Sequence, residues 1–395
     1  MRVYLDNAST TKMSDAAIKA MLPYFQEVYG NPSSLHTMGQ RAKEVLEQAR
    51  EQVAKCLGAQ PSEIYFTSGG SEADNQAILS AAAIGERKGK KHIVTTAFEH
   101  HAVLHTLKKL EKQGFTVTYL SVGKQGNVTP EQVAAAITED TCLVTTMAAN
   151  NEIGSVLPIK AIGAVCRERK VVFHTDAVQA VGHIHINVGE MNVDMLSLSA
   201  HKFHGPKGVG VLYAKKGIAL TNLIEGGAQE RGKRAGTENV AGVVGLAAAL
   251  TEATENLVQN GKKVAALRDK LIKGLSLIPQ SVLNGDRVNR LPGNVHFCFE
   301  GIEGESLLLL LDEFGVEASS GSACTSGSLD PSHVLLAIGH PHEIAHGSLR
   351  LTLSEYTTEE EVDYALQAVP QVVERLRNMS PVWRDKIQGK KPFLI

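Results

Sequence analysis

A single thiol, that of Cys324, lies in a run of small residues from Ser319 to Gly327 that reads Ser-Ser-Gly-Ser-Ala-Cys-Thr-Ser-Gly. Serine and glycine disfavour helix and leave the backbone solvated, so we expect a loop whose tip moves. A cysteine on such a loop is suited to the delivery of sulfur. The alternative is a flexible surface loop with an incidental cysteine, and this segment alone does not separate the two.

A glycine-rich turn is a second candidate site. Residues 67–72 read Thr-Ser-Gly-Gly-Ser-Glu, and they follow the strand-like residues 64–66 and precede an alanine-rich helix. The free N–H groups and the positive dipole end at the start of such a helix favour a phosphate at the turn. Many strand-to-helix turns are rich in glycine for steric reasons alone, so that alternative stays open.

Two charged residues follow strand-like segments further along the chain. Asp176 ends the segment 171–176, three residues before Gln179, and Lys202 comes just after the segment 195–199 in a turn rich in glycine. Because ligands bind at the carboxyl ends of parallel strands, we expect both charged side chains to point into one cleft. The alternatives are a helix N-cap for Asp176 and a solvated surface lysine for Lys202.

Together these groups fit the chemistry of pyridoxal phosphate. A lysine supplies the Schiff base, an aspartate keeps the pyridine nitrogen protonated, and a helix N-terminus holds the phosphate. His201 and His204 flank the lysine, either as a metal pair or as plain loop histidines. We expect no metal site, because no carboxylate or third histidine stands at ligand spacing.

The elements that must position these residues alternate in the manner of an α/β protein with a parallel sheet and crossover helices. The helical patterns include residues 102–113 and 158–169. The strand-like segments are residues 92–97, 115–121, 142–149, 171–176, 195–199 and 208–214.

The order of expected helices and strands then changes, which predicts a second, smaller α+β domain. One long helical segment, residues 240–278, leads into it. Strands are then expected over residues 294–299 and 348–353, and helices over residues 305–314 and 358–377. The last dozen residues are rich in lysine, and we expect a loosely held tail.

Composition and charge exclude several classes of protein. The 395 residues carry a net charge of −2 and no long basic run, which argues against nucleic acid or an anionic membrane as a partner. No apolar stretch is long enough to span a membrane, and the amino terminus lacks a secretory signal, so we expect a cytoplasmic protein. The 5 cysteines include no Cys-x-x-Cys pair, which indicates neither a disulfide framework nor a zinc site. Cys142 and Cys298, in apolar runs, are expected to be buried.

Six motifs, in order along the chain, carry a family resemblance. They are Tyr-Leu-Asp-Asn-Ala-Ser-Thr-Thr at 4–11, Gly-Asn-Pro-Ser-Ser at 30–34, Asn-Asn-Glu-Ile-Gly at 150–154, Ser-Ala-His-Lys at 199–202, Gly-Thr-Glu-Asn at 236–239, and the Cys324 segment. With them the chain resembles the cysteine desulfurases of the NifS/IscS type, in the class V branch of fold-type I pyridoxal-phosphate enzymes, over essentially its whole length. Residues 375–383 look more like NifS than IscS.

The resemblance implies a homodimer with the α/β fold of type I pyridoxal-phosphate-dependent transferases. A large domain, residues 14–260, would contain a mainly parallel seven-stranded sheet flanked by helices. Residues 1–13 and 261–395 would form the smaller α+β domain, which carries the loop of the active-site cysteine.

The resemblance also implies roles for single residues. Lys202 would bind the cofactor covalently and shuttle the α-proton, His100 would stack on the ring and act as an acid and base, and Cys324 would attack the substrate sulfur. The remaining contacts implied are Gly70, Ser71, Asp176, Gln179, Ser199, His201 and, from the partner subunit, Thr237 for the cofactor, with Asn151 and Arg350 for the substrate carboxylate.

The implied reaction is removal of sulfur from L-cysteine, which leaves L-alanine and a persulfide on Cys324. The sulfur would pass to a scaffold of the NifU or IscU kind for iron–sulfur cluster assembly, including nitrogenase maturation. The rival functions are a selenocysteine lyase and another class V lyase or aminotransferase. An aminotransferase would have no need of a cysteine in a mobile loop, whereas a selenocysteine lyase stays open.

Overall fold

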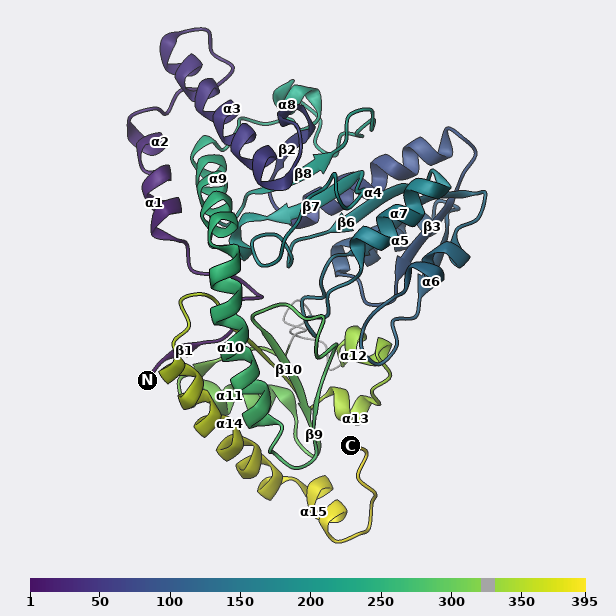
Figure 1. Cartoon of the computed structure of the whole chain (residues 1–395), viewed down its shortest axis with the longest axis vertical. Coiled ribbons are helices and arrows are strands. Elements are labelled where there is room, and N and C mark those ends of the chain that lie inside the picture. Colours follow the sequence, from purple (N-terminus) through teal and green to yellow (C-terminus); the bar gives the residue numbers. More distant parts are fainter. Residues whose placement is uncertain (321–330) are drawn as a thin grey trace.

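A seven-stranded sheet forms the centre of the upper part of the molecule in the computed structural model, which describes residues 1–320 and 331–395 (Figure 1). Its order is β2-β8-β7-β6-β5-β3-β4; the five strands from β7 to β4 are parallel, and β8 is antiparallel to both of its neighbours. The prediction of a mainly parallel α/β sheet is confirmed. The strands are β2 (Ile64–Thr67), β3 (His92–Thr96), β4 (Thr116–Leu120), β5 (Thr141–Met147), β6 (Val172–Asp176), β7 (Met195–Ser199) and β8 (Gly210–Ala214).

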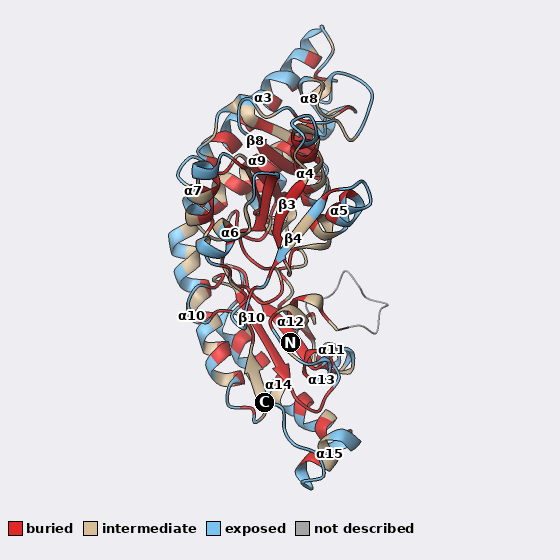
Figure 2. Cartoon of the chain, turned by 90° about the vertical axis from the view of Figure 1, so that its right-hand side faces the viewer, coloured by how far each residue is buried: buried red, intermediate tan, exposed pale blue. Residues whose placement is uncertain are grey.

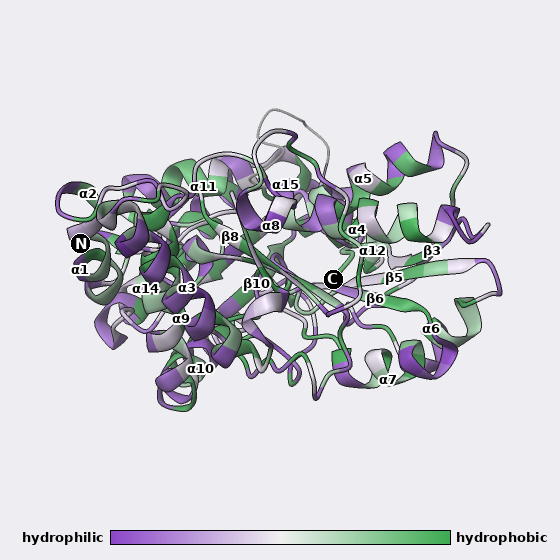
Figure 3. Cartoon of the chain, turned by 90° about the horizontal axis from the view of Figure 1, so that it is seen from above, coloured by the Kyte–Doolittle hydropathy of each residue, from purple (hydrophilic) through white to green (hydrophobic). Residues whose placement is uncertain are grey.

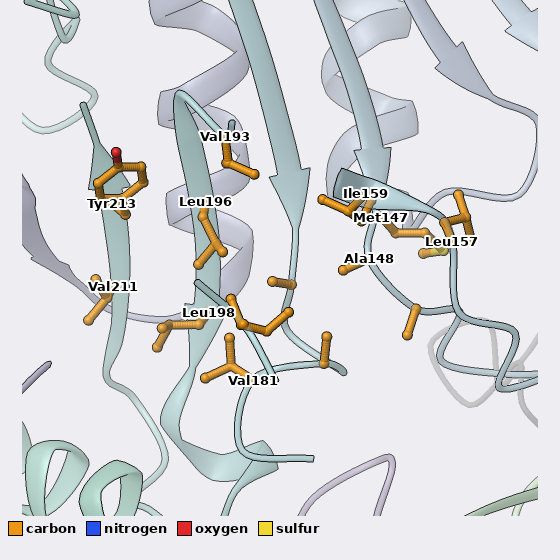
Figure 4. Packing of buried hydrophobic residues seen from close by; sticks show 14 of the residues in the cluster. Met147, Ala148, Leu157, Ile159, Val181, Val193, Leu196, Leu198, Val211 and Tyr213 are labelled. Atoms are coloured by element: carbon orange, nitrogen blue, oxygen red, sulfur yellow. The ribbon is translucent and has the colours of Figure 1, made fainter. Parts of the chain in front are cut away.

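Helices cover both faces of this sheet because each presents an apolar stripe to it. Helices α4 (Gly70–Glu86) and α5 (His101–Glu111) enclose one hydrophobic cluster, in which the small alanines of α4 allow close approach to the strands. Helices α3 (Thr37–Leu57), α7 (Ile159–Arg169) and α9 (Val240–Glu255) belong to the cluster on the other face. Figure 2 shows buried strands between half-exposed helices, and Figure 4 shows Leu196, Leu198 and Val211 of adjacent strands in the second cluster.

Two smaller sheets and a separate hydrophobic cluster make up the lower part of Figure 1. One sheet is antiparallel, in the order β12 (Ser348–Thr352), β10 (Asn294–Phe299), β9 (Ser281–Leu283), and the other pairs β1 (Val3–Tyr4) in parallel with β11 (Val316–Glu317). The cluster contains apolar side chains of α10 (Leu257–Leu275), α11 (Gly304–Glu313) and α14 (Glu359–Met379). The amino-terminal strand therefore packs among elements from the carboxyl-terminal third of the chain.

The long helix predicted over residues 240–278 is wrong in one respect, because it consists of two helices. Asn256 separates α9 from α10 with φ −97° and ψ 5°, outside the helical region. Its side-chain amide donates to the backbone oxygen of Glu252 at 2.9 Å, a local bond of the kind by which asparagine competes with helix continuation. The break lies between the helix that packs on the large sheet and the helix that packs on the small one.

The expectation of a loosely held carboxyl-terminal tail is also wrong. The backbone N–H groups of Leu394 and Ile395 donate to the carboxylate of Glu300 at 2.9 and 3.1 Å, and Glu300 is fully buried. Lys386 forms an ion pair with the same carboxylate. A buried carboxylate is costly unless hydrogen-bond donors surround it. The N–H groups of the tail supply such donors to Glu300, and these bonds fix the tail.

The remaining elements are short and lie mostly at the surface. In Figure 3, α3 and α14 carry many hydrophilic residues. Within the described part of the chain, none of the helices has the length and apolar character needed to cross a membrane. These shorter elements are α1 (Asp15–Met21), α2 (Pro23–Gln26), η1 (Pro61–Glu63), α6 (Pro130–Ala136), η2 (Ala200–Lys202), α8 (Gln229–Gly232), α12 (His333–Ala337), α13 (His342–Ala345) and α15 (Pro381–Ile387).

Candidate active site

Polar side chains from several strand ends gather around one cavity of about 350 Å³. They come from the carboxyl ends of β6 and β7, the start of α4, the turn before α5, the segment after β1 and strand β12. Among the described residues, every site residue predicted from the sequence lines this cavity except Thr237. The lining is Ala8, Ser9, Gly70, Ser71, Asp74, His100, Met147, Ala149, Asn151, Asp176, Val178, Gln179, Ser199, His201, Lys202 and Arg350.

The glycine-rich turn after β2 forms one end of the cavity and fits a phosphate group. Gly69 has φ +153°, which L side chains rarely adopt, and a Cβ added at Gly70 would lie 2.6 Å from Cγ2 of Val178. Glycine is thus required for the backbone to approach this closely. Gly70, Ser71, Ser199 and His201 also line an adjoining space of about 370 Å³, where α4 begins and its dipole favours an anion.

Lys202 is held at the floor of the cavity by the amino-terminal segment. Its Nζ donates to the backbone oxygens of Ala8 at 2.7 Å and Ser9 at 2.8 Å. Thr11 fixes the same segment to the lysine turn, because its N–H donates to the backbone oxygen of His201 at 3.0 Å. The primary amine is therefore oriented by two carbonyl oxygens inside the cavity, as a Schiff-base lysine requires.

Asp176 ends β6 and faces the cavity as a buried carboxyl group. Its Oδ1 accepts from the backbone N–H of Val178 at 3.0 Å. Burial raises the pKa of Asp176 to about 6, and the N–H of Val178 and the charge of Lys202 oppose that rise. A protonated pyridine nitrogen would supply the missing positive partner. Gln179 contributes a side-chain amide that donates to the backbone oxygen of Ala8 at 3.0 Å.

Two histidines border the cavity as neutral imidazoles. His100 is the N-cap of α5, and its Nδ1 accepts from the N–H of Ala102 at 3.1 Å. Burial, followed by the charge of Lys202, lowers the pKa of His100 to about 4. The same two causes lower the pKa of His201 to about 4, and its Nδ1 lies 3.1 Å from Oγ1 of Thr10. Since both are unprotonated near neutral pH, His100 can accept a proton there.

Arg350, on β12, closes the opposite side of the cavity. Nη1 donates to the backbone oxygen of Asn151 at 2.9 Å, and Nη2 donates to Oδ1 of Asp6 at 2.9 Å and to Oγ of Ser9 at 2.7 Å. Nε is buried and has no hydrogen-bond partner among the described residues. A buried donor without a partner is costly, so a carboxylate ligand beside Arg350 would satisfy it.

The structure describes the Cys324 segment only at its start, Ser319 and Ser320. Cys324 lies outside the described residues. Ser319, at the described end of its segment, pairs with the arginine strand: the N–H of Arg350 donates to the oxygen of Ser319 at 2.6 Å, and the reverse bond is 3.2 Å. The chain that leads to the cysteine thus starts beside Arg350.

Thr237 lies outside the main cavity. It is exposed and lines a separate space of about 60 Å³ that also includes Ser68 and Gly208. His204 likewise lies away from the cavity lining, because its ring bonds to the backbone oxygen of Lys12 at 2.7 Å and to Glu355 at 3.1 Å. His201 therefore lines the cavity, whereas His204 bonds to Lys12 and Glu355 outside it.

Sequence reasoning missed several groups of the site. Asp74 is a buried carboxyl group in the cavity lining, and Asp6 orients Arg350. The backbone oxygens of Ala8 and Ser9 orient Lys202. A carboxylate one turn into a helix that begins at a glycine-rich turn was the available signal for Asp74. The other groups depend on where the amino-terminal segment lies in the folded chain.

Three other cysteines are poor candidates for the chemistry. Cys142, Cys166 and Cys298 are buried, as the apolar surroundings of Cys142 and Cys298 predict. Burial raises the pKa of Cys142 to about 11 and those of Cys166 and Cys298 to about 12. A thiol with so high a pKa forms little of the nucleophilic thiolate at neutral pH.

Comparison with known proteins gives matches over almost the whole chain. The family model described as aminotransferase class-V matches residues 3–365. Cysteine desulfurases IscS of Clostridium botulinum and Methanosarcina thermophila are both 54% identical to the chain, over 99% of this chain and 99% of the first relative, and 96% of this chain and 94% of the second.

Solved structures show the same fold. A NifS-like protein superposes with a TM-score of 0.90 at 41% identity, over 95% of this chain and 100% of that one. The protein SspA, solved in complex with cysteine, superposes with a TM-score of 0.78 at 37% identity, over 90% of this chain and 100% of that one. The chain therefore belongs to the class V aminotransferase family of pyridoxal-phosphate enzymes and, within it, to the cysteine desulfurases.

Proposed function

We propose that the cavity bounded by Lys202, Asp176 and Arg350 binds L-cysteine beside pyridoxal phosphate and that the chain passes the substrate sulfur to Cys324. The observation that carries the proposal is the arrangement of an oriented amine, a buried carboxyl and a buried arginine with an unpaired Nε around one cavity of about 350 Å³. The solved relative SspA was obtained with cysteine, which supports an amino acid as the ligand of such a cavity.

The residues of the cavity suit the cofactor at each of its ends. Gly70, Ser71, Ser199 and His201 would hold the phosphate, Asp176 the ring nitrogen and Gln179 the ring oxygen. When bound, pyridoxal phosphate supplies an electron sink that eases loss of the α-proton of the substrate. Lys202 binds the cofactor and then moves that proton, and His100, as a neutral imidazole beside the ring, serves as a further acid and base.

Arg350 and Asn151 would fix the carboxylate of cysteine. The guanidinium is already oriented by Asp6 and Ser9, so little side-chain freedom is lost when the substrate binds. Ser319, five residues before Cys324 in the sequence, exchanges two backbone hydrogen bonds with Arg350. The segment of the proposed nucleophile therefore begins beside the residue proposed to bind the carboxylate.

Transfer of sulfur needs no external oxidant. The thiolate of Cys324 attacks the sulfur of the bound cysteine, a sulfur–sulfur bond forms, and the bond between that sulfur and the substrate Cβ breaks. The electron pair of the broken bond stays with the carbon, which takes up a proton and leaves as L-alanine. Cys324 then carries a persulfide, so that cysteine and one protein thiol give alanine and one protein persulfide.

The acceptor of the persulfide sulfur is proposed to be a scaffold of the NifU or IscU kind that builds iron–sulfur clusters. The relatives named IscS support this general role. The NifS-like look of residues 375–383 supports a contribution to nitrogenase maturation. In the structure this stretch spans the end of α14 and the start of α15, and Met379 and Val382 are exposed there.

The assembly and the compartment are part of the proposal. We propose a homodimer in which Thr237, exposed and outside the main cavity, reaches the cofactor phosphate of the partner subunit. The large domain would comprise residues 14–260 and the small one residues 1–13 and 261–395, in keeping with the break at Asn256. The free thiols of Cys56, Cys142, Cys166 and Cys298 suit the reducing cytoplasm.

Single-turnover mixing of the holoenzyme with L-cysteine tests the reaction. We expect one alanine for each active site and the mass of one added sulfur on the peptide that contains Cys324. The matched variant Cys324→Ser keeps the bound cofactor and forms no persulfide. Pyruvate or another keto acid with Cys324 unmodified would instead show a lyase or an aminotransferase, and faster release of selenium from selenocysteine than of sulfur from cysteine would favour a selenocysteine lyase.

A further inference from the structure

Asp74 is a buried carboxyl group to which the proposed reaction assigns no role. It lies on α4, one turn beyond the glycine-rich turn, is 1% exposed and lines the main cavity. Its Oδ1 has no hydrogen-bond partner among the described residues. An oxygen that is buried and unpaired is costly unless it carries or meets a proton.

A second carboxyl group stands close to it. Oxygen or nitrogen atoms of Asp74, Asp176 and His100 all lie within 4.8 Å of one another. His174 approaches from β6, and its Nε2 is 3.6 Å from Oδ1 of Asp74. The charged groups that act on Asp74 are Asp176 on β6 and Glu99 before α5. The ring of His174 approaches it from β6, and His100 and Lys202 line the same cavity.

The two carboxyl groups are not equivalent. Asp176 has the N–H of Val178 and the charge of Lys202 to stabilise its ionised form. Asp74 lacks such a cation, because burial lowers the pKa of its neighbour His174 to about 3 and so keeps that ring uncharged. Burial and then the charge of Asp176 raise the pKa of Asp74 well above its usual value, which a hydrogen bond with Ser197 only partly opposes. A proton shared by the pair therefore resides on Asp74.

The elements behind Asp74 hold it in place without neutralising it. The ring of His174 is fixed on both sides, by Oγ1 of Thr145 at 2.8 Å from Nδ1 and by Oγ of Ser197 at 3.0 Å from Nε2. All three are buried. Because the ring of His174 is fixed and uncharged beside Asp74, it does not neutralise the Asp74 carboxyl group.

We propose that Asp74 is a positioning residue, a neutral carboxylic acid whose O–H donates a hydrogen bond to Asp176 and keeps that carboxylate ionised against the ring nitrogen of the cofactor. This inference rests on the proposed function, in which Asp176 pairs with that nitrogen. Asp74 acts through Asp176, so it tunes the protonation of the ring and takes no part in the transfer of sulfur itself.

The test is a pH titration of the visible absorption of the holoenzyme. Asp74→Asn keeps a neutral donor, so its midpoint should stay within about 0.3 pH unit of the wild type. Asp74→Leu has a similar size but no donor. Its Asp176 becomes more basic, the ring nitrogen loses positive charge, and the midpoint should rise by about one pH unit, the scale of one hydrogen bond to a charged group.

Glu99→Gln is the matched control. Glu99 is also buried, and burial raises its pKa to about 8, but it does not line the cavity. Its Oε1 accepts from the backbone N–H of Met147 at 3.0 Å, and a glutamine oxygen keeps that bond. Because Glu99 acts on Asp74 and Asp176 only through its charge, the titration midpoint of Glu99→Gln should shift much less than that of Asp74→Leu. This comparison separates a specific role of Asp74 from a general effect of removing a buried acid.

Two results would overturn the proposal. If Asp74→Asn shifts the midpoint as far as Asp74→Leu, Asp74 is ionised and acts by its charge; if neither variant shifts it, Asp74 does not act on the cofactor. If urea titration shows that Asp74→Leu is not folded, Asp74→Ala replaces it, because alanine also lacks a hydrogen-bond donor and is smaller. Failure of the proposed function would appear differently, as a wild-type protein that binds pyridoxal phosphate without releasing alanine from cysteine.

Discussion

Two buried polar networks in this molecule differ in how completely they are satisfied. The carboxylate of Glu230 accepts from both Nη atoms of Arg50, at 2.8 and 2.7 Å, and from the N–H of Phe66 at 2.8 Å. Around the cavity, by contrast, Nε of Arg350 and Oδ1 of Asp74 lack partners among the described residues. The first network is complete among the described residues, whereas we propose that ligands and a proton complete the second.

The satisfied network holds strained backbone in place. Glu230 and Arg231 have φ of 47° and 57°, a left-handed conformation that costs non-glycine residues about 1–2 kcal/mol each. The bonds of Glu230 to Arg50 and to strand β2 fix this conformation. Arg231 adds a hydrogen bond to the backbone oxygen of Ile64 at 2.6 Å. The buried charges of Arg50 and Glu230 thus stabilise the structure, whereas those around the cavity are proposed to bind ligands.

The largest effect is expected in the unsatisfied network. Lys202→Ala removes the amine that we propose to bind the cofactor and to move the α-proton, so alanine formation should fall by at least about a thousandfold. The free energy of unfolding of the cofactor-free chain should change little, about 1 kcal/mol, because the bonds from Nζ to the backbone oxygens of Ala8 and Ser9 each contribute little net stability. Rapid-quench assays and urea titrations measure the two quantities. A large loss of stability with activity retained would contradict the assignment.

The opposite pattern is expected for Glu230→Gln. This change leaves the charge of Arg50 buried without its partner, which should lower the free energy of unfolding by about 3–5 kcal/mol. Alanine formed per bound cofactor should stay unchanged. The control is Glu47→Gln: Glu47 also contacts Arg50, at 3.3 Å, but its side chain is 50% exposed. Its effect should be below about 1 kcal/mol, and equal effects of the two variants would refute the role given to burial.

Substrate affinity is the next quantity to change. Arg350→Lys keeps a positive charge near Asp6 but loses the planar fork, so KM for cysteine should rise about 10- to 100-fold, the equivalent of one hydrogen bond between charged groups. Steady-state alanine release as a function of cysteine concentration measures this. An unchanged KM with a lower kcat would show that Arg350 does not hold the substrate carboxylate.

The smallest effect concerns the pH dependence of stability. Burial raises the pKa of Glu99 from 4.5 to about 8, so the folded chain binds that proton more tightly than the unfolded chain does. The resulting stabilisation is complete below pH 4.5 and is lost as the pH rises through about 8, with a slope of at most about 1.4 kcal/mol per pH unit. Glu99→Gln should flatten this slope in urea titrations between pH 5 and 8, whereas Glu47→Gln should keep it.

Much of the fold could be predicted because it depends on local patterns. The apolar runs around β6 and β7 place Asp176 and Lys202 at strand ends, and the turn at Gly70 precedes a helix as expected. His100, Asn151 and Arg350 entered only through the family resemblance, since a histidine before a helix or an arginine in a strand has no distinctive local signal.

The features that were missed depend on contacts between distant parts of the chain. The tail is fixed because Glu300, in the turn after β10, needs donors, and a lysine-rich ending alone cannot show that. The break at Asn256 depends on the φ and ψ of one residue within an otherwise helical pattern. Asp74 becomes notable only when α4 packs beside β6 and brings it near Asp176.

The most direct test of the contrast between the two networks measures the same two quantities in Arg350→Lys and Glu230→Gln. Urea unfolding gives the stability of each variant, and single-turnover mixing with L-cysteine gives its ability to form alanine and the Cys324 persulfide. We predict that Arg350→Lys loses reaction at low cysteine concentration while its stability stays within about 1 kcal/mol of the wild type, and that Glu230→Gln loses stability while the reaction per bound cofactor persists. Equal losses of stability in both variants, with cysteine turnover unaffected in Arg350→Lys, would contradict the account.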